Sequence, residues 1–500
     1  MEQNWEAMMG AELSASLREN RALFERMLRP EINSDAVFRP FEACGRPALL
    51  IYVEGMADDR KIAEFILRAG AADARERYAV DDAQQLIRRV LEIAQCEPEN
   101  RVGRIVEAVI GGMTALFAEG FDEAVLMETR GYPARSVAQT TNESVVIGAQ
   151  EGFVESLRTN MTLLRRYVQS PRLITECFSV GRSVPCRVCL AYLDGVADDG
   201  VVAEARRRLK SIDAPAVQGL GAVQQLIEDS PWTLLPQMLQ TERPDRAASC
   251  LLDGQVVILA ENSPCALAAP ITVFHQLHAS DDSFSRWQYG TFLRLIRFLG
   301  MLISVFLPGM YVALTAYHMH LIPLSLLGSI AEARSNVPFP ILTEILIMEF
   351  SFYLINEAGT RMPQQIGSAL GIVGALILGQ AAVSASIISP ILIIIVALTG
   401  LGSYAVPDYG FSLGLVICRL FVILCGALLG LYGVSLAAFC LLSGLCGMRS
   451  LGYPYVAPVA PHRRHNPDIL LRLPMWMQRL PMFYAAGDSW IRKGKGASRP

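Results

Sequence analysis

One stretch is apolar enough to enter a bilayer and yet holds several polar side chains. The stretch is FPILTEILIMEFSFYLINEAGTRMP, residues 339–363, and five of its polar residues are candidates for function, the first of them Glu344. The other members fall at i, i+4, i+7 and i+11, one stripe of a helix: Glu349, Tyr353, Asn356 and Thr360. Ionisable groups at membrane depth are expensive and usually face a protein interior or water. Two interpretations stay open: a surface helix with its stripe in the headgroups, or a helix whose five polar residues line an ion path in an oligomer.

The elements that would position this stripe are apolar helices. Between Phe298 and Met448 charges almost disappear, and residues 298–317 alone are long enough to span a bilayer. Residues 366–405 are divided by ISP at 388–390, which predicts two spans, and residues 411–448 are also too long for one. If residues 340–358 span as well, the total is six, and Arg419 lies inside a span with a partner in the bundle. Small residues in LGQAAVSAS and GALLG predict close helix packing.

Both ends of the chain carry signals for the cytoplasmic side. The N-terminus is polar and has no apolar signal-peptide core. The tail from His462 has eight basic residues against two acidic ones, and Arg286, Arg294 and Arg297 precede the first span. Within the tail, DILLRLPMWMQRLPMFY is typical of a segment that lies along membrane lipid. We therefore expect an integral membrane protein with its N-terminal part and its tail inside, and no role in nucleic-acid binding.

The polar half shows no constellation typical of an enzyme. No GxxxxGK[ST], HExxH or GxSxG occurs in the sequence. HQLH, with His275 and His278 followed by Asp281 and Asp282, could begin a metal site, but no further ligand cluster completes it. A polar surface before the membrane is the preferred interpretation of that segment. We predict a protein that is not an enzyme and has no catalytic residues, no bound metal and no cofactor.

The eleven cysteines are scattered and predict no disulfide framework. CRVC at residues 186–189 has a CxxC spacing, but it lies in a strand-like run. Alternation along a strand sends its two sulfurs to opposite faces. Structural cysteines are the favoured interpretation.

A repeated phrase shows that the polar half is duplicated. YVEGMADD at 52–59 returns as YLDGVADD at 192–199, and QQLI at 84–87 returns at 224–227, both at an offset of 140. GGMTALFAEG from Gly111 parallels DGQVVILAEN from Asp253. Asp58 and Asp198 can cap the helices that follow, which explains the phrase better than a divalent-cation site does. Each copy is predicted to be a strand, two helices and a hairpin.

The predicted fold is therefore a pair of duplicated cytoplasmic α/β subdomains followed by an α-helical transmembrane bundle. We expect the following domains: a helical lead-in at 1–45, α/β subdomains at 46–145 and 146–290, a polytopic membrane domain at 291–450, and a basic cytoplasmic tail at 451–500.

Several motifs make the family of the chain recognisable. The whole run from NVPFPILTEILIMEF to IIIVALTG resembles the signature of the bacterial spore germination family GerA, which comprises germinant receptor A subunits and SpoVAF-type proteins. GAQEGFVESLRTNMTLLRR, TERPD and LGYPYVAPVAP support the resemblance, which covers about residues 35–465. The positions that match the family motifs are Gly152, Asn160, Arg165, Thr241, Glu242, Arg243, Pro244, Asp245, Glu357, Arg361 and Pro363.

The resemblance implies a function that composition alone does not. It implies a protein of the spore inner membrane that works with a transporter-like, nutrient-sensing B-type subunit and a lipoprotein C-type subunit. A subunits of this family are thought to form a ring-shaped homo-oligomer that releases cations when nutrient binds. The ion-path interpretation of the stripe is then favoured. Two alternatives remain: a SpoVAF-type accessory channel, and a membrane-anchored scaffold that docks partners without conducting ions.

Overall fold

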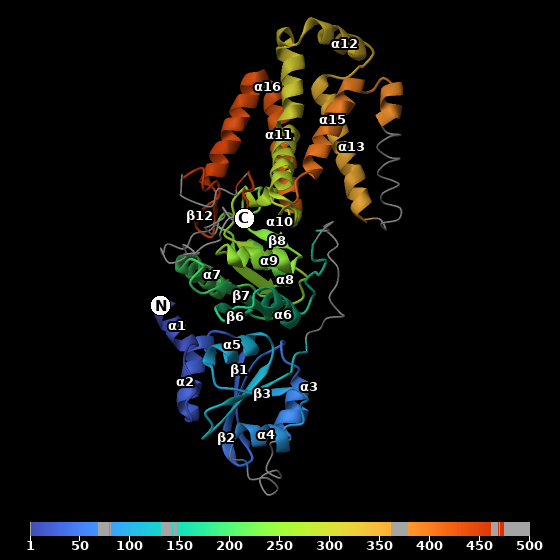
Figure 1. Ribbon diagram of the computed structural model, residues 1–500. Coiled ribbons are helices and arrows are strands. Elements are labelled where there is room, and N and C mark those ends of the chain that lie inside the picture. The colour runs from blue at the N-terminus through green and yellow to red at the C-terminus, as the bar shows by residue number, and fades with distance from the viewer. Residues whose placement is uncertain are drawn as a thin grey trace. The chain divides into compact units, whose positions relative to one another are not determined.

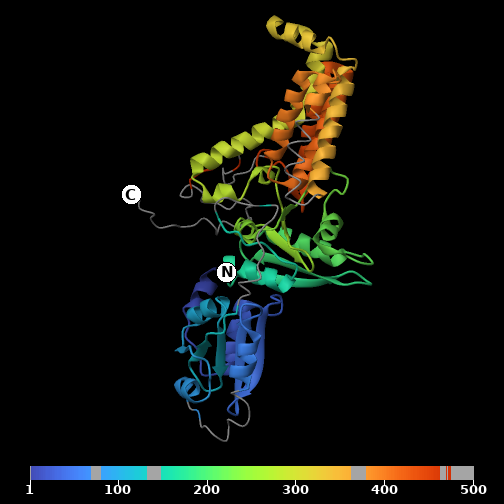
Figure 2. The same cartoon turned by 90° about the vertical axis from the view of Figure 1, so that its right-hand side faces the viewer.

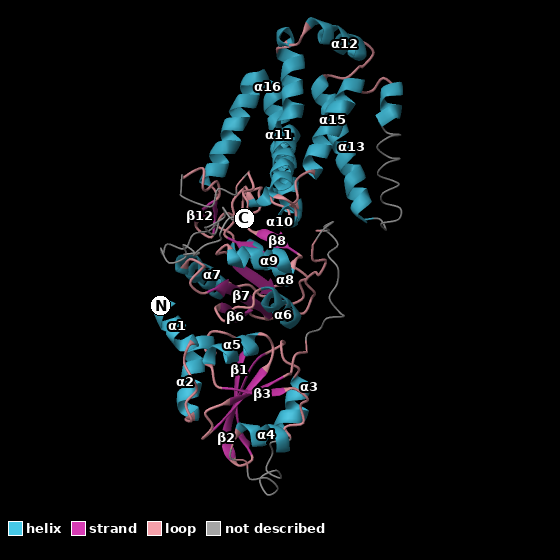
Figure 3. Cartoon of the chain, in the orientation of Figure 1, coloured by secondary structure: helices cyan, strands magenta, loops and turns pink. Residues whose placement is uncertain are grey.

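The computed structural model describes residues 2–68, 80, 82–131, 143, 148–361, 379–461, 469 and 471–474. Within these residues the chain forms two compact units. The first comprises Met1–Pro231 and Met238–Ile271, and the second comprises Trp232–Gln237 and Thr272–Gln478. The first unit contains the large sheets, and the second is mostly helical (Figure 3).

The first sheet is antiparallel and has the order β1-β2-β4-β5-β3. It belongs to the blue-to-cyan part of the chain in Figure 1. Its strands are β1 (Ala36–Ala43), β2 (Arg46–Val53), β3 (Cys96–Glu99), β4 (Thr114–Ala118) and β5 (Ala124–Met127). Apolar side chains alternate between its two faces, because successive residues of a strand point in opposite directions. Leu49 and Ile51 enter one core, while Leu50 enters the other.

Helices cover both faces of this sheet. The core that holds Leu49 and Ile51 is closed by α1 (Glu2–Met9), α2 (Leu17–Leu28) and α5 (Val102–Ile110). The opposite core is closed by the π-helical turn η1 (Ile62–Leu67), which follows α3 (Asp59–Lys61), and by α4 (Ala83–Arg89). Two layers of helix thus bury a sheet that is apolar on both sides.

The second sheet repeats this arrangement in the order β6-β7-β9-β10-β8. Its strands are β6 (Leu173–Val180), β7 (Cys186–Leu193), β8 (Leu239–Thr241), β9 (Val256–Ala260) and β10 (Ala266–Ala269). The helices of this subdomain are α6 (Leu157–Tyr167), α7 (Asp199–Ser211), α8 (Gly219–Ile227) and α9 (Pro244–Leu252). The predicted duplication is confirmed, because both strand order and helix order recur.

The repeated phrase lies at the same place in each copy. Each phrase ends the second strand and begins the next helix, and its aspartate is the N-cap. Asp58 accepts a hydrogen bond from the backbone N–H of Arg60 at 2.9 Å, and Asp198 accepts one from that of Gly200 at 2.7 Å. The predicted capping is confirmed.

The second unit begins with a short 3₁₀ turn, η3 (His275–Leu277), and α10 (Asp281–Phe284), which lead into a helical bundle (Figure 2). The bundle contains α11 (Trp287–Tyr317), η4 (Met319–Leu321), α12 (Leu324–Arg334), α13 (Ile341–Arg361), α15 (Pro390–Tyr404) and α16 (Tyr409–Gly447). A small ribbon of β11 (Arg449–Ser450) and β12 (Tyr453–Pro454) follows. Among the described residues, α11 and α16 are the helices long and apolar enough to cross a membrane.

Two predicted breaks in the apolar runs are present. Pro390 is the first residue of α15, so ISP at 388–390 does separate two helices. Gly430 interrupts α16 with φ +64°, a left-handed conformation that favours glycine. A Cβ on Gly433 would clash with the carbonyl of Cys425, which shows that the chain folds back on itself at Gly430. Residues 411–448 therefore form two helices, as predicted.

Small residues let α11, α15 and α16 pack closely. A Cβ added at Gly402 of α15 would lie 2.5 Å from the carbonyl of Gly300 in α11, and one at Gly426 of α16 would lie 2.7 Å from the carbonyl of Gly309. Ser304 and Ser403 share a hydrogen bond of 2.6 Å between these helices. The close packing predicted for GALLG, which contains Gly426, is confirmed.

Candidate functional site

The polar stripe of α13 faces the other helices of its own bundle. Glu349 pairs with Arg419 of α16, with Oε2 3.5 Å from Nε, and the two side chains are 2% and 1% exposed. Tyr353, one turn further along α13, lies with its ring centroid 5.4 Å from Cζ of Arg419. The partner that Arg419 was expected to find inside the bundle is therefore Glu349, and a cation–π contact supports the pair.

This cluster leaves much of its hydrogen-bonding capacity unused. Among the residues that the structure describes, both carboxylate oxygens of Glu349, Nε and Nη2 of Arg419 and the hydroxyl of Tyr353 are buried without a hydrogen-bond partner. The Nε to Oε2 distance is longer than a good hydrogen bond. Removing two charges from water is costly, and attraction offsets that cost only with good geometry and further hydrogen bonds. The two charges thus attract each other but lack most of their hydrogen bonds. A small movement of the helices, or a water molecule in the cluster, would change the free energy of the pair.

Glu344, near the beginning of α13, connects three elements. It accepts hydrogen bonds from Nη2 of Arg334 in α12 at 3.1 Å and from the backbone N–H of Ser389 at 3.2 Å. Ser389 is the N-cap residue of α15, where a negative charge is favourable. Glu344 therefore fixes the beginning of α13 against α12 and α15.

The stripe continues toward α15 at its other end. Oδ1 of Asn356 accepts a hydrogen bond of 3.0 Å from the hydroxyl of Tyr404. Thr360 and Arg361 end α13, but their side chains lie outside the described residues, as does the whole of Pro363. The described part of the stripe thus contacts α15 and α16 within the bundle.

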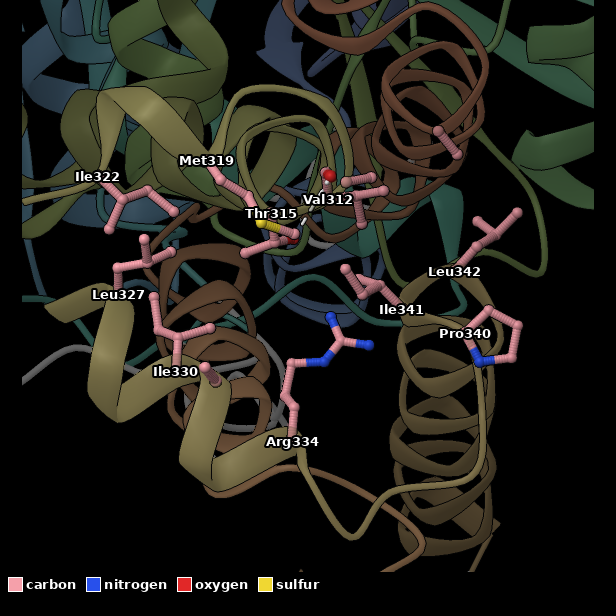
Figure 4. Close-up of a pocket in the computed structure, with 13 residues that line it drawn as sticks. Val312, Thr315, Met319, Ile322, Leu327, Ile330, Arg334, Pro340, Ile341 and Leu342 are labelled. Atoms are coloured by element: carbon pink, nitrogen blue, oxygen red, sulfur yellow. Dashed lines mark hydrogen bonds between the residues drawn. The ribbon is translucent and has the colours of Figure 1, made fainter. Parts of the chain in front are cut away.

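A hollow of about 480 Å³ adjoins the Glu344–Arg334 pair (Figure 4). Val312 and Thr315 of α11, Leu327 and Ile330 of α12, and Ile341 of α13 contribute to its wall. Arg334 reaches the hollow from α12 in the close-up. An apolar wall gives a hydrated cation nothing to bind, so the polar groups of α13 remain the better candidates for contact with an ion.

The family-motif residues of the first unit hold its loops and helices together through buried hydrogen bonds. Asn160 in α6 is fully buried. Its side-chain oxygen accepts a hydrogen bond from the N–H of Val154 at 2.8 Å, and its side-chain amide donates one to the carbonyl of Val154 at 2.5 Å. These two bonds fix the loop that leads into α6. Asn20 in α2 makes the same pair of bonds with Ser14, at 3.0 and 2.6 Å. The sequence signal for this match is the pair SLREN at 16–20 and SLRTN at 156–160, which are again 140 residues apart. This pair was not used in predicting the duplication.

Arg165 joins the two subdomains. It donates to both carboxylate oxygens of Asp35, which precedes β1, and its bond from Nη2 to Oδ1 is 2.6 Å long. The same nitrogen donates to Oδ1 of Asn33 at 2.9 Å. Both charged side chains are almost fully buried, with 3% and 4% exposed. We call this cluster of Asn33, Asp35 and Arg165 the joint.

TERPD builds the turn that starts α9. Arg243 is fully buried and donates from Nη2 to Asp245 at 2.7 Å and to the carbonyl of Ala149 at 2.9 Å. Pro244 is the first residue of the helix. The carbonyl of Glu242 accepts from the N–H of Phe153, next to the buried Gly152. The hydroxyl of Thr241 donates to Glu143. These residues hold the loop before α6 against α9. Glu357 lies in α13, outside this region.

The first copy of the repeated phrase, YVEGMADD, lies beside a second hollow of about 400 Å³. Asp58, Asp59 and Arg158 contribute to the wall of this hollow. Arg158 donates to Asp59 at 2.7 Å, and that hydrogen bond is the main reason why the pKa of Arg158 is raised. Asp58 is used as a helix cap. In the described residues no group of three or more His, Cys, Asp or Glu is arranged to hold a metal ion.

The interpretation of HQLHASDD as polar surface is wrong. His275 and Asp282 are buried, and Asp282 accepts from Arg297 at 2.7 Å and from Arg294 at 3.2 Å. Nε2 of His278 lies 2.7 Å from the carbonyl of Ile469. The arginines belong to the first turns of α11, which bring them back over α10.

The predicted lipid-bound segment of the tail lies mostly outside the described residues, but Arg472 is buried and donates to the carbonyl of Ser285 at 3.0 Å.

The whole length of the chain resembles known proteins. A family model described as Bacillus/Clostridium GerA spore germination protein matches residues 23–482. The chain is 35% identical over 490 residues to an uncharacterized membrane protein, YfkQ, of Bacillus subtilis, which covers 97% of this chain and 94% of that protein. It is 35% identical over 449 residues to spore germination protein KA of the same organism, with 89% and 82% covered. Spore germination protein GerLA of Bacillus cereus is 33% identical over 478 residues, with 94% and 97% covered.

Among solved structures, the chain is similar to the N-terminal domain of the A subunit of the Bacillus megaterium spore germinant receptor GerK3. The identity is 27% and the TM-score is 0.41, with 52% of this chain and 96% of that chain covered. The family match and the full-length relatives lead to one conclusion. The chain belongs to the GerA family of spore germination proteins.

Proposed function

We propose that this protein is a membrane subunit of a spore germination complex that assembles as a homo-oligomer and conducts cations when a partner senses a nutrient. In this proposal it lies in the spore inner membrane, with the soluble unit and the basic tail on the core side. Its partners are a transporter-like B-type subunit and a lipoprotein C-type subunit. Family membership and two helices of spanning length support a membrane role in germination.

The observation that carries the proposal is the Glu349–Arg419 pair. Both charges are buried among apolar helices and leave hydrogen-bonding groups unfilled. An apolar pair of similar volume would often stabilise a bundle as well or better. Ionisable groups that persist at membrane depth mark ion pathways, proton relays or switches. A purely structural role is therefore a poor explanation of this cluster.

The pair suggests how a path would be closed and opened. In the closed state, Arg419 neutralises Glu349 and holds α13 against α16. A signal from the partner subunit would separate these helices slightly, and the carboxylate would then face a water-filled centre shared between protomers. A ring of such carboxylates attracts cations into a pore. Tyr353, Asn356, Thr360 and Glu344 would line the same wall.

The test is potassium release from spores that carry Glu349→Gln. This change leaves Arg419 buried without its counter-charge, which penalises the closed state by about 3–5 kcal/mol, or about two to four orders of magnitude in the closed-to-open ratio. We expect the assembled variant to release potassium without nutrient. The double variant Glu349→Arg, Arg419→Glu exchanges the two charges and restores the ion pair. Potassium release without nutrient should then stop, although α13 now carries an arginine in place of the carboxylate at position 349.

Glu332→Gln is the matched control, because Glu332 is an exposed carboxylate of α12 in the same unit. It should behave like the natural protein. If correctly assembled Glu349→Gln protein gives normal potassium release with and without nutrient, the ion-path role of this residue is excluded. The membrane unit would then be an anchor, and the protein a scaffold that docks its partners.

A further inference from the structure

Two cysteines face each other across the edge of the second sheet. β6 and β7 are antiparallel, and Cys177 is the direct register partner of Cys189. Directly opposed residues of an antiparallel pair have Cα atoms about 4.5–5.5 Å apart and side chains on the same face. A disulfide requires Cα atoms about 4.4–6.8 Å apart. The strand register therefore already supplies the spacing that a disulfide needs.

The environment makes the two thiols unequal. The neighbouring Cys189 thiol lowers the pKa of Cys177 below its ordinary value. The Cys177 thiol and full burial raise the pKa of Cys189. Cys177 is only partly buried and lies on β6, an edge strand. Because the thiolate is the reactive form, Cys177 is the accessible nucleophile and Cys189 the buried resolving thiol.

Neighbouring cysteines do not share this geometry. Cys186 belongs to the same strand as Cys189, but its register partner is Val180. Its sulfur instead lies 3.7 Å from the carbonyl of Arg187. Cys186 and Cys189 both lie in β7 and are three residues apart, so they lie on opposite faces of the strand, as the sequence predicted.

The cysteine pair lies beside the joint. The N–H of Cys177 donates to the hydroxyl oxygen of Ser34 at 3.0 Å, and the N–H of Ser34 donates to the carbonyl of Thr175 at 2.8 Å. Ser34 stands between Asn33 and Asp35, which bind Arg165. A covalent change at Cys177 would therefore act on the backbone that connects the two subdomains.

We propose that Cys177 and Cys189 are a redox modification site that forms a reversible cross-strand disulfide. The oxidant is a low-molecular-weight disulfide. The Cys177 thiolate attacks it and releases one thiolate, which leaves a mixed disulfide at Cys177. Cys189 then loses its proton and attacks the sulfur of Cys177, which releases the second thiolate. Two protein thiols become one disulfide, and one small disulfide becomes two thiols.

The test treats the full-length protein in detergent with oxidised glutathione, blocks free thiols and maps linked peptides by mass spectrometry. The natural protein and Cys186→Ser should both give a peptide that joins residues 177 and 189, and dithiothreitol should remove it. Cys177→Ser should not give it. Linkage should be at least tenfold more efficient in the folded protein than in urea, because folding holds the sulfurs together.

Two outcomes would overturn the proposal. The first is a stable glutathione adduct at Cys177 with Cys189 still reduced, which would show that the resolving step does not occur. The second is equal linkage in folded and unfolded protein, which would show that strand register plays no part.

Discussion

Replacing Asp35 with alanine tests how much the joint contributes to the stability of the first unit. Arg165 donates to both oxygens of Asp35, to Asn33 at 2.9 Å and to the carbonyl of Leu173 at 3.2 Å. The Arg165 side chain is 3% exposed. Asp35→Ala removes its counter-charge and leaves the guanidinium buried, because neither remaining acceptor carries a charge.

The expected loss is about 3–5 kcal/mol in the free energy of unfolding, the usual effect of breaking a buried pair by removing one partner. The matched control is Arg182–Asp213, whose contact of 2.7 Å is equally short but whose side chains are 68% and 71% exposed. An exposed pair contributes about 0–1 kcal/mol, so Asp213→Ala should have little effect. The comparison therefore separates the effect of burial on the free energy of unfolding from the effect of the distance between the two charges.

The assay is urea unfolding of a fragment with residues 1–271, followed by far-ultraviolet circular dichroism. With a slope of about 3 kcal/mol per molar urea, Asp35→Ala should lower the midpoint by about 1–1.7 M and Asp213→Ala by less than about 0.3 M. The double variant Asp35→Leu, Arg165→Met removes both charges and should recover most of the loss. Equal shifts for Asp35→Ala and Asp213→Ala would refute the reasoning, and so would a double variant as unstable as Asp35→Ala.

Two further predictions concern the repeated phrase and α7. Asp58→Ala or Asp198→Ala should each lower the stability of the same fragment by about 1 kcal/mol through loss of an N-cap, while a chelator leaves its melting temperature unchanged; a large shift with chelator would favour a bound cation instead. Hydrogen bonds from Arg207 and Arg208 lower the pKa of Glu204 to about 2. Because this pKa is depressed in the folded state, the contribution is complete above the ordinary carboxyl range and is lost as pH falls toward 2. The difference in melting temperature between the natural protein and Glu204→Gln should therefore shrink between pH 5 and pH 2, and a constant difference would contradict this assignment.

The sequence allowed the architecture to be predicted where a local pattern repeats. Similar phrases 140 residues apart predicted the duplication, and the proline of ISP predicted the break at Pro390. The length of the run 411–448 predicted two helices, but the place where they meet, Gly430, was not predicted. The first strand of each sheet and the short edge strands β3 and β8 were not predicted. Strands of three or four residues carry too few alternations to be distinguished from loop.

The contacts of the candidate site were harder to predict than its residues. Helical spacing placed Glu349 and Tyr353 on one face of α13, but spacing cannot show which distant helix that face meets. Arg419 was expected to have a partner, and only the fold identifies it as Glu349. Asp282 was misjudged for the same reason, because its arginines lie on the next helix and return to it only when α11 folds over α10.

The joint also shows why the two halves of the soluble unit are no longer interchangeable. The N–H of Glu54 binds the carbonyl of Asp35 just as the N–H of Asp194 binds that of Arg172, so Asp35 and Arg172 are equivalent positions. Arg165 of α6 corresponds to Glu25 of α2, since Asn160 and Asn20 align these helices.

A homodimer of the first half, built around this joint, would place Glu25 against Asp35. A homodimer of the second half would place Arg165 against Arg172. Like charges meet in both, and opposite charges meet only when the halves are different. The charges at these positions therefore favour pairing of unlike halves, and we expect separately expressed halves to recombine as a heterodimer.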